Sequence, residues 1–433
     1  MRLLVLGAGV SGRAVARLAR SHQHVVSVYD EGRPDPTGLL DIGVGIVSGA
    51  WDSGLLDGID LVVASPGFSE RSLPIVETLE WGLPIWSEIE YSWRQLEDVP
   101  VVAITGTNGK TTVTALTAAM LQASGIRSTA VGNIGTPLAD AIGMDMDVLV
   151  VEVSSFQLRF IDRFHPVAAA ILNVAADHLD WHGSVQAYAA AKRRIFERHD
   201  ADDLLVYDAD DAGATDAVRH APSRLHPVSA RALPVDGSGV DEDHLRIGGT
   251  VSIPIVELGS TDPAHIVDLA AAGALALDRG AEAAAVASVA RGFAPGPHRR
   301  VLVGRVGGVD FVDDSKATNP HAALAAIAAY PSVVLIAGGL SKGLDLAPLA
   351  AAPQVRALIG IGTAGPGLVN QAGERGHPAA TMEEAVETAA RLAQPGDTVL
   401  LAPGAASFDQ FDSYAQRGEL FATAVSKLEE GDR

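Results

Sequence analysis

Residues 104–112 read ITGTNGKTT, a glycine-rich run that departs from the usual phosphate-binding pattern. That pattern is G-x-x-x-x-G-K-[ST]; counting back from Gly109, the first glycine should be residue 104, which is isoleucine. The apolar residues 101–105 predict a strand, and residues 111 to about 124 predict a helix. A glycine turn between a strand and a helix predicts a shortened phosphate loop, and the alternative is a glycine-rich turn that carries a surface lysine.

The residue types in this run suit a nucleoside triphosphate. Gly106 and Gly109 free the backbone to curl around phosphate oxygens. Lys110 can neutralise the β- and γ-phosphates, and the Thr111 hydroxyl can coordinate Mg²⁺. We therefore expect the whole run to bind ATP, through Gly106, Thr107, Asn108, Gly109, Lys110, Thr111 and Thr112.

A second glycine loop lies at the start of the chain. After the apolar run Leu3–Leu6, the sequence GAGVSG matches G-x-G-x-x-G at Gly7, Gly9 and Gly12, and Asp30 ends the next apolar run about 20 residues on. Such a loop places a pyrophosphate on a helix N-terminus, and nothing in that arrangement demands nicotinamide. The residues leave three readings open: a dinucleotide, another nucleotide, or a plain tight turn.

Three residues downstream are candidates for metal or phosphate chemistry. Glu152 ends the strand-like run VLVVE, where a lone acid is costly unless it is paired or binds a cation; the alternative is an acid turned to solvent. His178, in NVAADHLDWHGS, is a candidate ligand or phosphate contact, although a lone histidine is more often structural. Lys192 stands beside Arg193 and Arg194 on a predicted helix, so the residues alone favour a solvated basic face.

The organisation of the chain predicts an α/β protein with mostly parallel sheets, because strands alternate with helices. A third strand, Val309–Val312, leads through DDSKATNP into an alanine-rich helix over residues 321–329, with Asn319 as its cap and Pro320 at its first position. Residues 225–258 suggest hairpins, and residues 269–290 suggest one or two packed helices. We expect three domains, comprising residues 1–96, 97–296 and 297–433, the last two joined by the linker-like RGFAPGPHRR.

Composition narrows the class of protein. The 433 residues are 48% hydrophobic and 20% charged, with 32 Lys and Arg against 53 Asp and Glu. The net charge of −21 argues against nucleic-acid and anionic-membrane binding. There is no cysteine, and we find neither a signal peptide nor an apolar run long enough to span a membrane. We therefore expect a cytoplasmic protein.

Seven runs occur in the order that is typical of one family: GTNGKTT, EVSSFQL, NVAADHLDWHGS, AKRRIF, PHRR, DDSKATNP and APGAASFDQF. On these runs the chain resembles the Mur ligases, ATP-dependent amino-acid ligases of peptidoglycan precursor synthesis, over essentially its whole length. The resemblance implies a Rossmann-like first domain, a central P-loop ATPase-like domain and a Rossmann-like third domain. DSKATNP and SFDQF favour the member that adds D-glutamate to UDP-N-acetylmuramoyl-L-alanine.

The resemblance also implies roles for the candidate residues. Lys192 matches a carbamylated lysine that helps to hold a second Mg²⁺, so the basic-face reading would be wrong. Thr111 and Glu152 match ligands of the Mg²⁺ shared with ATP. His178 matches a residue of the second metal and substrate region, and Asn133 matches a substrate and phosphate contact. The implied catalytic set is Lys110, Glu152, His178, Lys192 and Lys316.

The remaining implied positions lie near the two ends of the chain. The uridine-diphosphate substrate would pass Val10, Ser11, Asp30 and Arg33, replacing the nicotinamide reading of the first loop. The third domain would supply ATP contacts at Arg299 and Asp314, a residue toward the γ-phosphate at Lys316, and a D-glutamate pocket from Thr318, Lys342, Ser407 and Phe408. Two departures affect these roles. His265 and Asp268 stand where the family has an asparagine pair near the adenine, and Phe408 and Tyr414 stand where leucine and phenylalanine are common.

The implied reaction phosphorylates the alanine carboxylate with ATP and then lets the glutamate amine displace phosphate. We expect a monomer, with a hinge near residues 294–298. The alternatives are a related ligase for another amino acid or for folyl-polyglutamate, an NAD-dependent oxidoreductase, and a non-catalytic nucleotide-binding protein.

Overall fold

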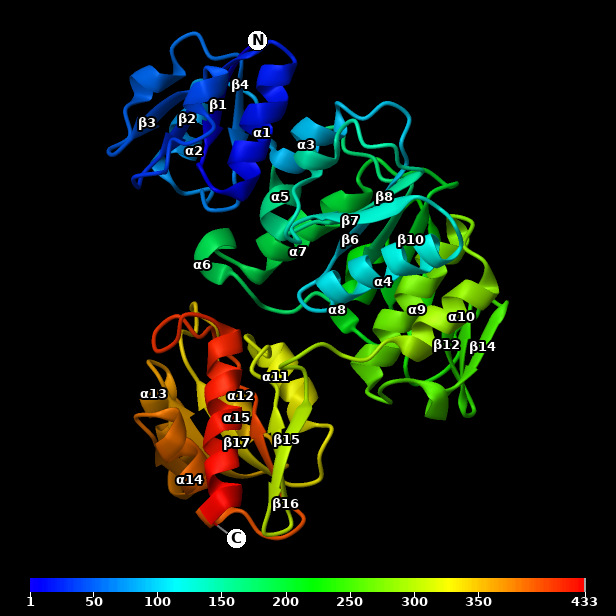
Figure 1. The fold of residues 1–433 in the computed structure, drawn as a ribbon, viewed down its shortest axis with the longest axis vertical. Coiled ribbons are helices and arrows are strands. Elements are labelled where there is room, and N and C mark those ends of the chain that lie inside the picture. Colours follow the sequence, from blue (N-terminus) through cyan, green and yellow to red (C-terminus); the bar gives the residue numbers. More distant parts are fainter. Residues whose placement is uncertain (432–433) are drawn as a thin grey trace. The chain divides into compact units, whose positions relative to one another are not determined.

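The computed structural model describes residues 1–431, in which three mostly parallel sheets are flanked by helices (Figure 1). This confirms the predicted α/β class. The chain forms two compact units: residues 1–174 with 181–294, and residues 175–180 with the chain from Pro295 onward. The first unit holds two of the sheets, and the predicted boundary near residue 96 falls inside it. The exact domain boundaries stay predictions.

The first sheet is fully parallel, in the order β3-β2-β1-β4-β5. Its strands are β1 (Arg2–Leu6), β2 (Val25–Asp30), β3 (Gly45–Ser48), β4 (Leu61–Ala64) and β5 (Ile85–Ser87), and its helices are α1 (Val10–Ser21), α2 (Leu73–Glu80) and α3 (Glu88–Trp93), with short 3-10 turns η1 (Leu40–Ile42) and η2 (Ser53–Leu56). The order reverses between β1 and β4. Ligands of open α/β sheets bind outside the carboxyl ends of the strands at such a switch point.

The second sheet has nine strands, in the order β14-β13-β12-β11-β10-β9-β6-β8-β7. The strands are β6 (Val101–Thr105), β7 (Ser128–Gly132), β8 (Val148–Glu152), β9 (Ala168–Ile171), β10 (Leu204–Asp208), β11 (Arg224–Ser229), β12 (Ser238–Asp241), β13 (His244–Ile247) and β14 (Val251–Pro254). Only β12, β13 and β14 pair antiparallel, which confirms the hairpins predicted in residues 225–258. The central strands are apolar throughout because both faces of the sheet are covered.

Helices and 3-10 turns cover this sheet on both faces. They are α4 (Lys110–Ala123), η3 (Leu138–Ala141), α5 (Ser155–Arg159), α7 (Val185–Arg193), η4 (Arg194–Phe196), α8 (Ala212–Val218), η5 (Ile255–Glu257), α9 (Pro263–Asp278) and α10 (Ala283–Gly292). Trp181 of the short helix α6 (Leu179–His182) packs instead with the core of the first sheet. Buried residues of α4 and α9 share one core with β6, β10 and the hairpin strands. The alanine-rich stretch therefore forms two helices, as one of its readings predicted.

The third sheet has the order β15-β16-β20-β17-β18-β19, antiparallel only between β15 and β16. Its strands are β15 (Val301–Val306), β16 (Val309–Asp313), β17 (Val333–Gly338), β18 (Val355–Ile361), β19 (Gly376–Pro378) and β20 (Thr398–Leu401); its helices are α11 (Pro320–Ile327), α12 (Ala347–Ala351), α13 (Gly365–Ala372), α14 (Met382–Leu392) and α15 (Tyr414–Gly431), with η6 at Gly373–Arg375. The predicted cap of α11 is confirmed, since the Asn319 side chain accepts from the Ala322 N–H and Pro320 opens the helix.

A buried carboxylate joins the first sheet to the second within the first unit. Glu90 on α3 accepts hydrogen bonds from the backbone N–H groups of Asp162, Arg163 and Phe164, at 2.9–3.1 Å, and pairs with Arg94. A carboxylate that receives several backbone donors is well compensated for its burial. Helix α3 therefore serves as a structured connection between the two sheets.

Among the described residues, no helix combines the length and the apolar character that crossing a membrane requires.

Candidate active site

The shortened glycine loop lies between the end of β6 and the start of α4, as predicted. The backbone N–H of Thr107 donates to the Asn173 carbonyl (3.0 Å), and the N–H of Asn108 donates to the Asn173 side chain (2.7 Å). Asn173, which follows β9, therefore fixes the curve of the loop from the neighbouring strand. Sequence reasoning missed Asn173; its only signal was an amide directly after a buried strand.

Gly109 is required where the loop enters the helix. Its φ of 85° lies in the left-handed region, and a Cβ there would stand 2.6 Å from Asp268 Oδ1 and 2.9 Å from Leu172 Cδ1. Helix α4 then begins at Lys110, and its N-cap residue, Gly109, has no side chain that could accept from the first turn. The N–H groups and the dipole at a helix start favour an anion.

Lys110 folds back across the loop. Its ammonium donates to the carbonyls of Gly106 (2.8 Å) and Thr107 (3.0 Å), and the side chain is half-buried. The alternative of a surface lysine on a plain turn therefore does not describe this residue.

Three elements bring oxygen-bearing groups together beside this loop. Thr111 Oγ1 on α4 donates to Glu152 Oε2 at the end of β8 (2.8 Å), and Asn133 Nδ2, just after β7, donates to Glu152 Oε1 (2.9 Å). Glu152 is only 2% exposed, so the solvent-facing alternative is wrong. A hydroxyl and a carboxylate beside a phosphate loop are the hard oxygen donors that Mg²⁺ prefers.

The same region does not form a metal site from protein groups alone. Across residues 1–431, no cluster of three or more histidine, aspartate or glutamate side chains is arranged to hold a metal ion. Mg²⁺ usually keeps waters and binds through one or two carboxylates plus substrate phosphates. Thr111 and Glu152 therefore fit a Mg²⁺ ion that arrives with the nucleotide.

Lys192 is buried, at 1% exposure, so the solvated basic face predicted from the residues alone is wrong. Its ammonium donates to the Gly106 carbonyl (2.7 Å), lies 3.4 Å from Thr105 Oγ1, and stands 4.6 Å from the centre of the Tyr188 ring. The reason is tertiary: α7 packs this face against the phosphate loop, whereas Arg193 next to it is exposed. Tyr188, whose hydroxyl lies 3.1 Å from Thr107 Oγ1, was also missed.

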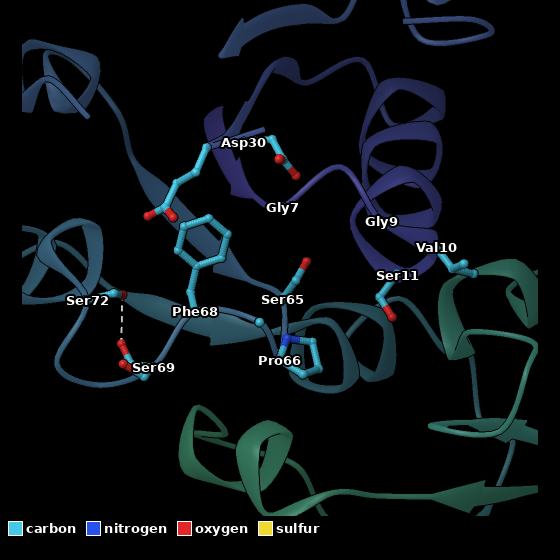
Figure 2. Close-up of a pocket in the computed structure, with 12 residues that line it drawn as sticks. Gly7, Gly9, Val10, Ser11, Asp30, Ser65, Pro66, Phe68, Ser69 and Ser72 are labelled. Carbon is cyan, nitrogen blue, oxygen red and sulfur yellow. Dashed lines mark hydrogen bonds between the residues drawn. The ribbon is translucent and has the colours of Figure 1, made fainter. Parts of the chain in front are cut away.

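The first glycine loop opens onto a hollow of about 480 Å³ at the switch point of the first sheet (Figure 2). Gly12 must be glycine, because a Cβ there would lie 1.9 Å from the Gly7 carbonyl oxygen. Gly9 faces open space. Val10, Ser11 and Asp30, three of the residues predicted to bind substrate, line this hollow, whereas the exposed Arg33 is not one of its lining residues.

Half of the lining comes from a loop that sequence reasoning missed. It follows β4 and contributes Ser65, Pro66, Gly67, Phe68, Ser69 and Ser72. The available signal was a Ser-Pro-Gly turn directly after an apolar strand. The twelve described lining residues include two carboxylates and neither lysine nor arginine, so backbone N–H groups and hydroxyls are the donors they offer to a diphosphate.

The Asp30 carboxylate lines this hollow and also accepts two backbone hydrogen bonds. Its Oδ2 accepts from the Ala8 N–H (2.8 Å) and its Oδ1 accepts from the Gly32 N–H (2.9 Å). The carboxylate therefore shapes the glycine loop and the turn after β2.

The second unit holds the other predicted residues. Asp314 is buried at the end of β16; its N–H donates to the Leu401 carbonyl (2.9 Å), and Arg300 Nε lies 3.9 Å from Oδ2. Lys316 Nζ stands 5.2 Å from the Tyr414 ring centre, and the Thr318 N–H donates to the Lys316 carbonyl. The remaining four are the half-buried Arg299, Lys342, with a φ of 53°, the buried Ser407, and Phe408, which is 71% exposed.

His178 also belongs to this second unit. Its Nε2 lies 3.8 Å from Asp177 Oδ2, and the same oxygen lies 3.4 Å from Asn319 Nδ2. The segment 175–180 thus contacts the DDSKATNP loop.

Arg417, on α15, is a residue that the sequence did not single out. It is fully buried and donates to Ser315 Oγ (2.9 Å), the Ser315 carbonyl (2.9 Å) and the Ala405 carbonyl (3.1 Å). Burial lowers its pKa to about 10. Arg417 therefore ties the DDSKATNP loop to the GAASF loop.

The two residues that replace the expected asparagine pair lie on α9. His265 is buried and stacks on Phe293 with ring centres 5.7 Å apart, and desolvation lowers its pKa. Asp268 lies against Gly109, directly behind the phosphate loop.

Each of the three sheets lies largely within a segment that matches a known domain family. Residues 1–87 match the Mur ligase MurD-like N-terminal domain, residues 104–233 the Mur ligase middle domain, and residues 298–405 the Mur ligase glutamate ligase domain.

Several proteins named UDP-N-acetylmuramoylalanine--D-glutamate ligase are similar over nearly the whole chain. The protein of Frankia casuarinae is 43% identical over 99% of this chain and 94% of its own. That of Thermobifida fusca is 40% identical over 99% and 98%, and that of Mycobacterium tuberculosis is 38% identical over 98% and 95%. Among solved structures, a pseudomurein peptide ligase type C from Methanothermus fervidus (TM-score 0.61, 18% identity, all of both chains) and MurF from Acinetobacter baumannii (0.59, 16%, 88% of this chain and 93% of that one) share the fold.

Proposed function

Because this chain belongs to the Mur ligase family, we propose that it joins D-glutamate to UDP-N-acetylmuramoyl-L-alanine at the expense of ATP, in peptidoglycan precursor synthesis. The observation that carries the proposal is the convergence of Lys110, Thr111, Asn133, Glu152 and Lys192 on one phosphate loop. Relatives of nearly the same length that are named for this activity supply the substrates.

The proposed reaction has two steps. The alanine carboxylate attacks the γ-phosphorus of ATP, so that an acyl phosphate forms and ADP leaves. The neutral amine of D-glutamate then attacks the acyl carbon; the C–O bond to phosphate breaks, an amide forms, and the amine gives up a proton. Both steps crowd negative charge between a carboxylate and a triphosphate, and positively charged or N–H donors lower that cost.

The residues of the first unit have distinct parts in this proposal. The start of α4 and Lys110 bind the phosphates, and Asn173 keeps the loop curved around them. Thr111 and Glu152 would hold Mg²⁺, which when bound neutralises phosphate charge. Asn133 orients Glu152 by donating to its Oε1 atom. We also assign Asn133 a contact to the substrate and its phosphate. The remaining loop residues Gly106, Thr107, Asn108, Gly109 and Thr112 complete the ATP site.

For Lys192 we propose carbamylation. The amine would bond to carbon dioxide and lose a proton, which replaces an ammonium with a carboxylate able to help hold a second Mg²⁺. We assign His178 separately to the substrate and metal chemistry of the reaction. A buried ammonium beside the Lys110 ammonium is unfavourable, and both groups donate to the same Gly106 carbonyl. Converting one of them to an anion would remove the repulsion.

The second unit would supply the amino-acid half of the reaction. We assign Arg299 and Asp314 to ATP, Lys316 to the γ-phosphate, and Thr318, Lys342, Ser407 and Phe408 to D-glutamate. The hollow lined by Val10, Ser11 and Asp30 would take the uridine diphosphate. We assign Arg33 to the same substrate. A monomer in the cytoplasm, with domains of residues 1–96, 97–296 and 297–433, completes the proposal.

The test is phosphate release over a matrix of nucleotide substrates and amino acids. We expect release only when ATP, UDP-N-acetylmuramoyl-L-alanine and D-glutamate are all present, with L-glutamate and other D-amino acids inactive. Release that needs no amino acid, or that prefers a different one, would overturn the assignment.

A further inference from the structure

The turn that follows β2 is held to helix α1 by one arginine. Arg13 Nη1 donates to the Thr37 carbonyl (3.1 Å) and Nη2 donates to the Asp35 carbonyl. Residues 33–36 belong to no helix or strand. Within the turn itself, Asp35 Oδ1 accepts from the Thr37 N–H (2.9 Å) and hydroxyl (2.6 Å), and these two bonds are the main causes that lower its pKa.

The same guanidinium also reaches the glycine loop. Arg13 Nε donates to the Ala8 carbonyl (2.8 Å), while the N–H of Ala8 donates to Asp30 Oδ2 (2.8 Å). Ala8 is therefore held at both its N–H and its carbonyl, by the acid that ends β2 and by the arginine one turn into α1.

These contacts determine part of the wall of the hollow shown in Figure 2. Gly7 and Gly9 on either side of Ala8 line the hollow, and so do Asp30 and Glu31 at the start of the turn. Arg13 itself is not among the twelve lining residues. Its guanidinium bonds the carbonyl of Ala8, between the lining residues Gly7 and Gly9, and the carbonyls of residues 35 and 37, a few residues after the lining Glu31. One planar group thus links the two segments that continue into the wall.

We propose that Arg13 is a positioning residue for the nucleotide substrate, setting the spacing between the glycine loop and the turn after β2. The inference rests on the proposed function, since it concerns the site assigned to the uridine diphosphate. Three fixed donors of one rigid fork hold carbonyls of residues 8, 35 and 37. A flexible chain with one ammonium cannot reproduce that fork.

The chain offers a matched control on the same helix. Arg20, near the end of α1, also bonds backbone carbonyls, donating to those of Ile42 (2.8 Å) and His24 (2.6 Å). Neither partner is next to a lining residue in the chain, whereas Ala8, the partner of Arg13, lies between the lining residues Gly7 and Gly9. Arg20→Ala therefore removes the same kind of contact without touching the proposed site.

The experiment compares full-length wild type, Arg13→Ala, Arg13→Lys and Arg20→Ala. Binding of UDP is measured by calorimetry, and the KM for UDP-N-acetylmuramoyl-L-alanine and for ATP by phosphate release. For both Arg13 variants we expect the Kd for UDP and the KM for the nucleotide substrate to rise about tenfold, the scale of a lost charge-assisted hydrogen bond. The KM for ATP and kcat should stay within about twofold of wild type, and Arg20→Ala should bind UDP as wild type does.

The outcomes separate this inference from the function on which it rests. Wild-type protein that binds no UDP would overturn the proposed function. Wild-type protein that binds UDP, together with an Arg13→Lys variant that binds it equally well, would overturn the positioning role. A purely structural arginine would lower the melting temperature and leave the ratio of the two KM values unchanged, and that result would also overturn it. Arg13→Lys keeps the aliphatic stem and the charge, so it carries the test if Arg13→Ala folds poorly.

Discussion

At the residue scale, the Gly106 carbonyl accepts hydrogen bonds from two lysines. Lys110 donates to it at 2.8 Å and Lys192 at 2.7 Å, so two ammonium groups share one oxygen at the phosphate loop. Like charges this close raise each other's energy unless an anion lies between them or one group loses its charge. The arrangement is suited either to binding phosphate or to converting one lysine to a carbamate.

Substitution of Lys192 separates these possibilities. We expect Lys192→Ala to lower kcat by a factor of about 100 or more, the range seen when a group that stabilises transition-state charge is removed. If the active form is a carbamate, added short carboxylates such as acetate should restore part of the phosphate release. Arg193→Ala, which alters the exposed neighbour on the same helix, should leave activity near wild type. Full activity of Lys192→Ala without any additive would contradict the proposed role.

At the element scale, the start of α4 depends on a glycine whose environment excludes any other residue. Gly109 combines a φ of 85° with a Cβ position 2.6 Å from Asp268. We expect Gly109→Ala to cost about 1–2 kcal/mol from the left-handed backbone alone. It should also abolish measurable ATP binding, because the loop must move to relieve the contact.

Gly125, just beyond the other end of α4, is the matched control. Its φ is 78°, but a Cβ there meets nothing within 4 Å. Gly125→Ala should therefore show the backbone cost in thermal unfolding and keep wild-type ATP affinity by calorimetry. Equal ATP affinity in the two variants would show that the start of α4 does not need glycine for phosphate binding.

The junction between α3 and η3 predicts a pH dependence of stability. Glu88 on α3 is 1% exposed, accepts from the Ala139 N–H (2.8 Å) and the Ser92 hydroxyl (3.3 Å), and lies near Asp140, which pairs with Arg17. Burial raises the pKa of Glu88 to about 7. A folded-state pKa above the unfolded value means that the stability contribution is complete below about pH 4.5 and is lost as the pH rises to about 7.

Glu88→Gln removes this titration and keeps the size of the side chain. Relative to wild type, we expect the variant to gain about 3 kcal/mol in free energy of unfolding between pH 4.5 and pH 8, the energy of a shift of this size. Denaturant unfolding of both proteins at the two pH values measures the difference, and other titrating groups cancel in the comparison. A difference that does not change with pH would contradict the raised pKa of Glu88.

These elements also show which features of the fold and the site could be predicted from the sequence. Strand β6 and the start of α4 were predictable to within a residue, because a continuous apolar run, a glycine turn and a helical run follow one another locally. The burial of Lys192 was not, because it depends on which face of α7 packs against a loop about 80 residues earlier in the chain. Asn173, Tyr188 and Arg417 escaped notice for the same reason: their partners are remote in sequence.

At the scale of the whole molecule, an acidic protein is proposed to bind anionic substrates. The formal charge is −21, and the hollow of the first sheet is lined by two carboxylates and by neither lysine nor arginine among its described residues. The chain has few cationic side chains, and two of them, Lys110 and Lys192, lie together at the second glycine loop. The two lysines therefore lie at the phosphate loop of a chain whose net charge is strongly negative.

Salt distinguishes the repulsion by the whole chain from the effect of nearby groups, because the two act over different distances. At about 10 mM salt the Debye length is roughly 30 Å, so a substrate meets the repulsion of the whole chain; at about 150 mM it is roughly 8 Å, and only nearby groups act. We expect the association rate of UDP to rise severalfold between these concentrations, measured by stopped flow. Uridine, which carries no phosphate, should show no such change. A UDP association rate that falls with salt would mean that cations outside the described lining attract the ligand. Arg33 and Arg71, which lies in the sequence between the lining residues Ser69 and Ser72, would then be the first residues to substitute.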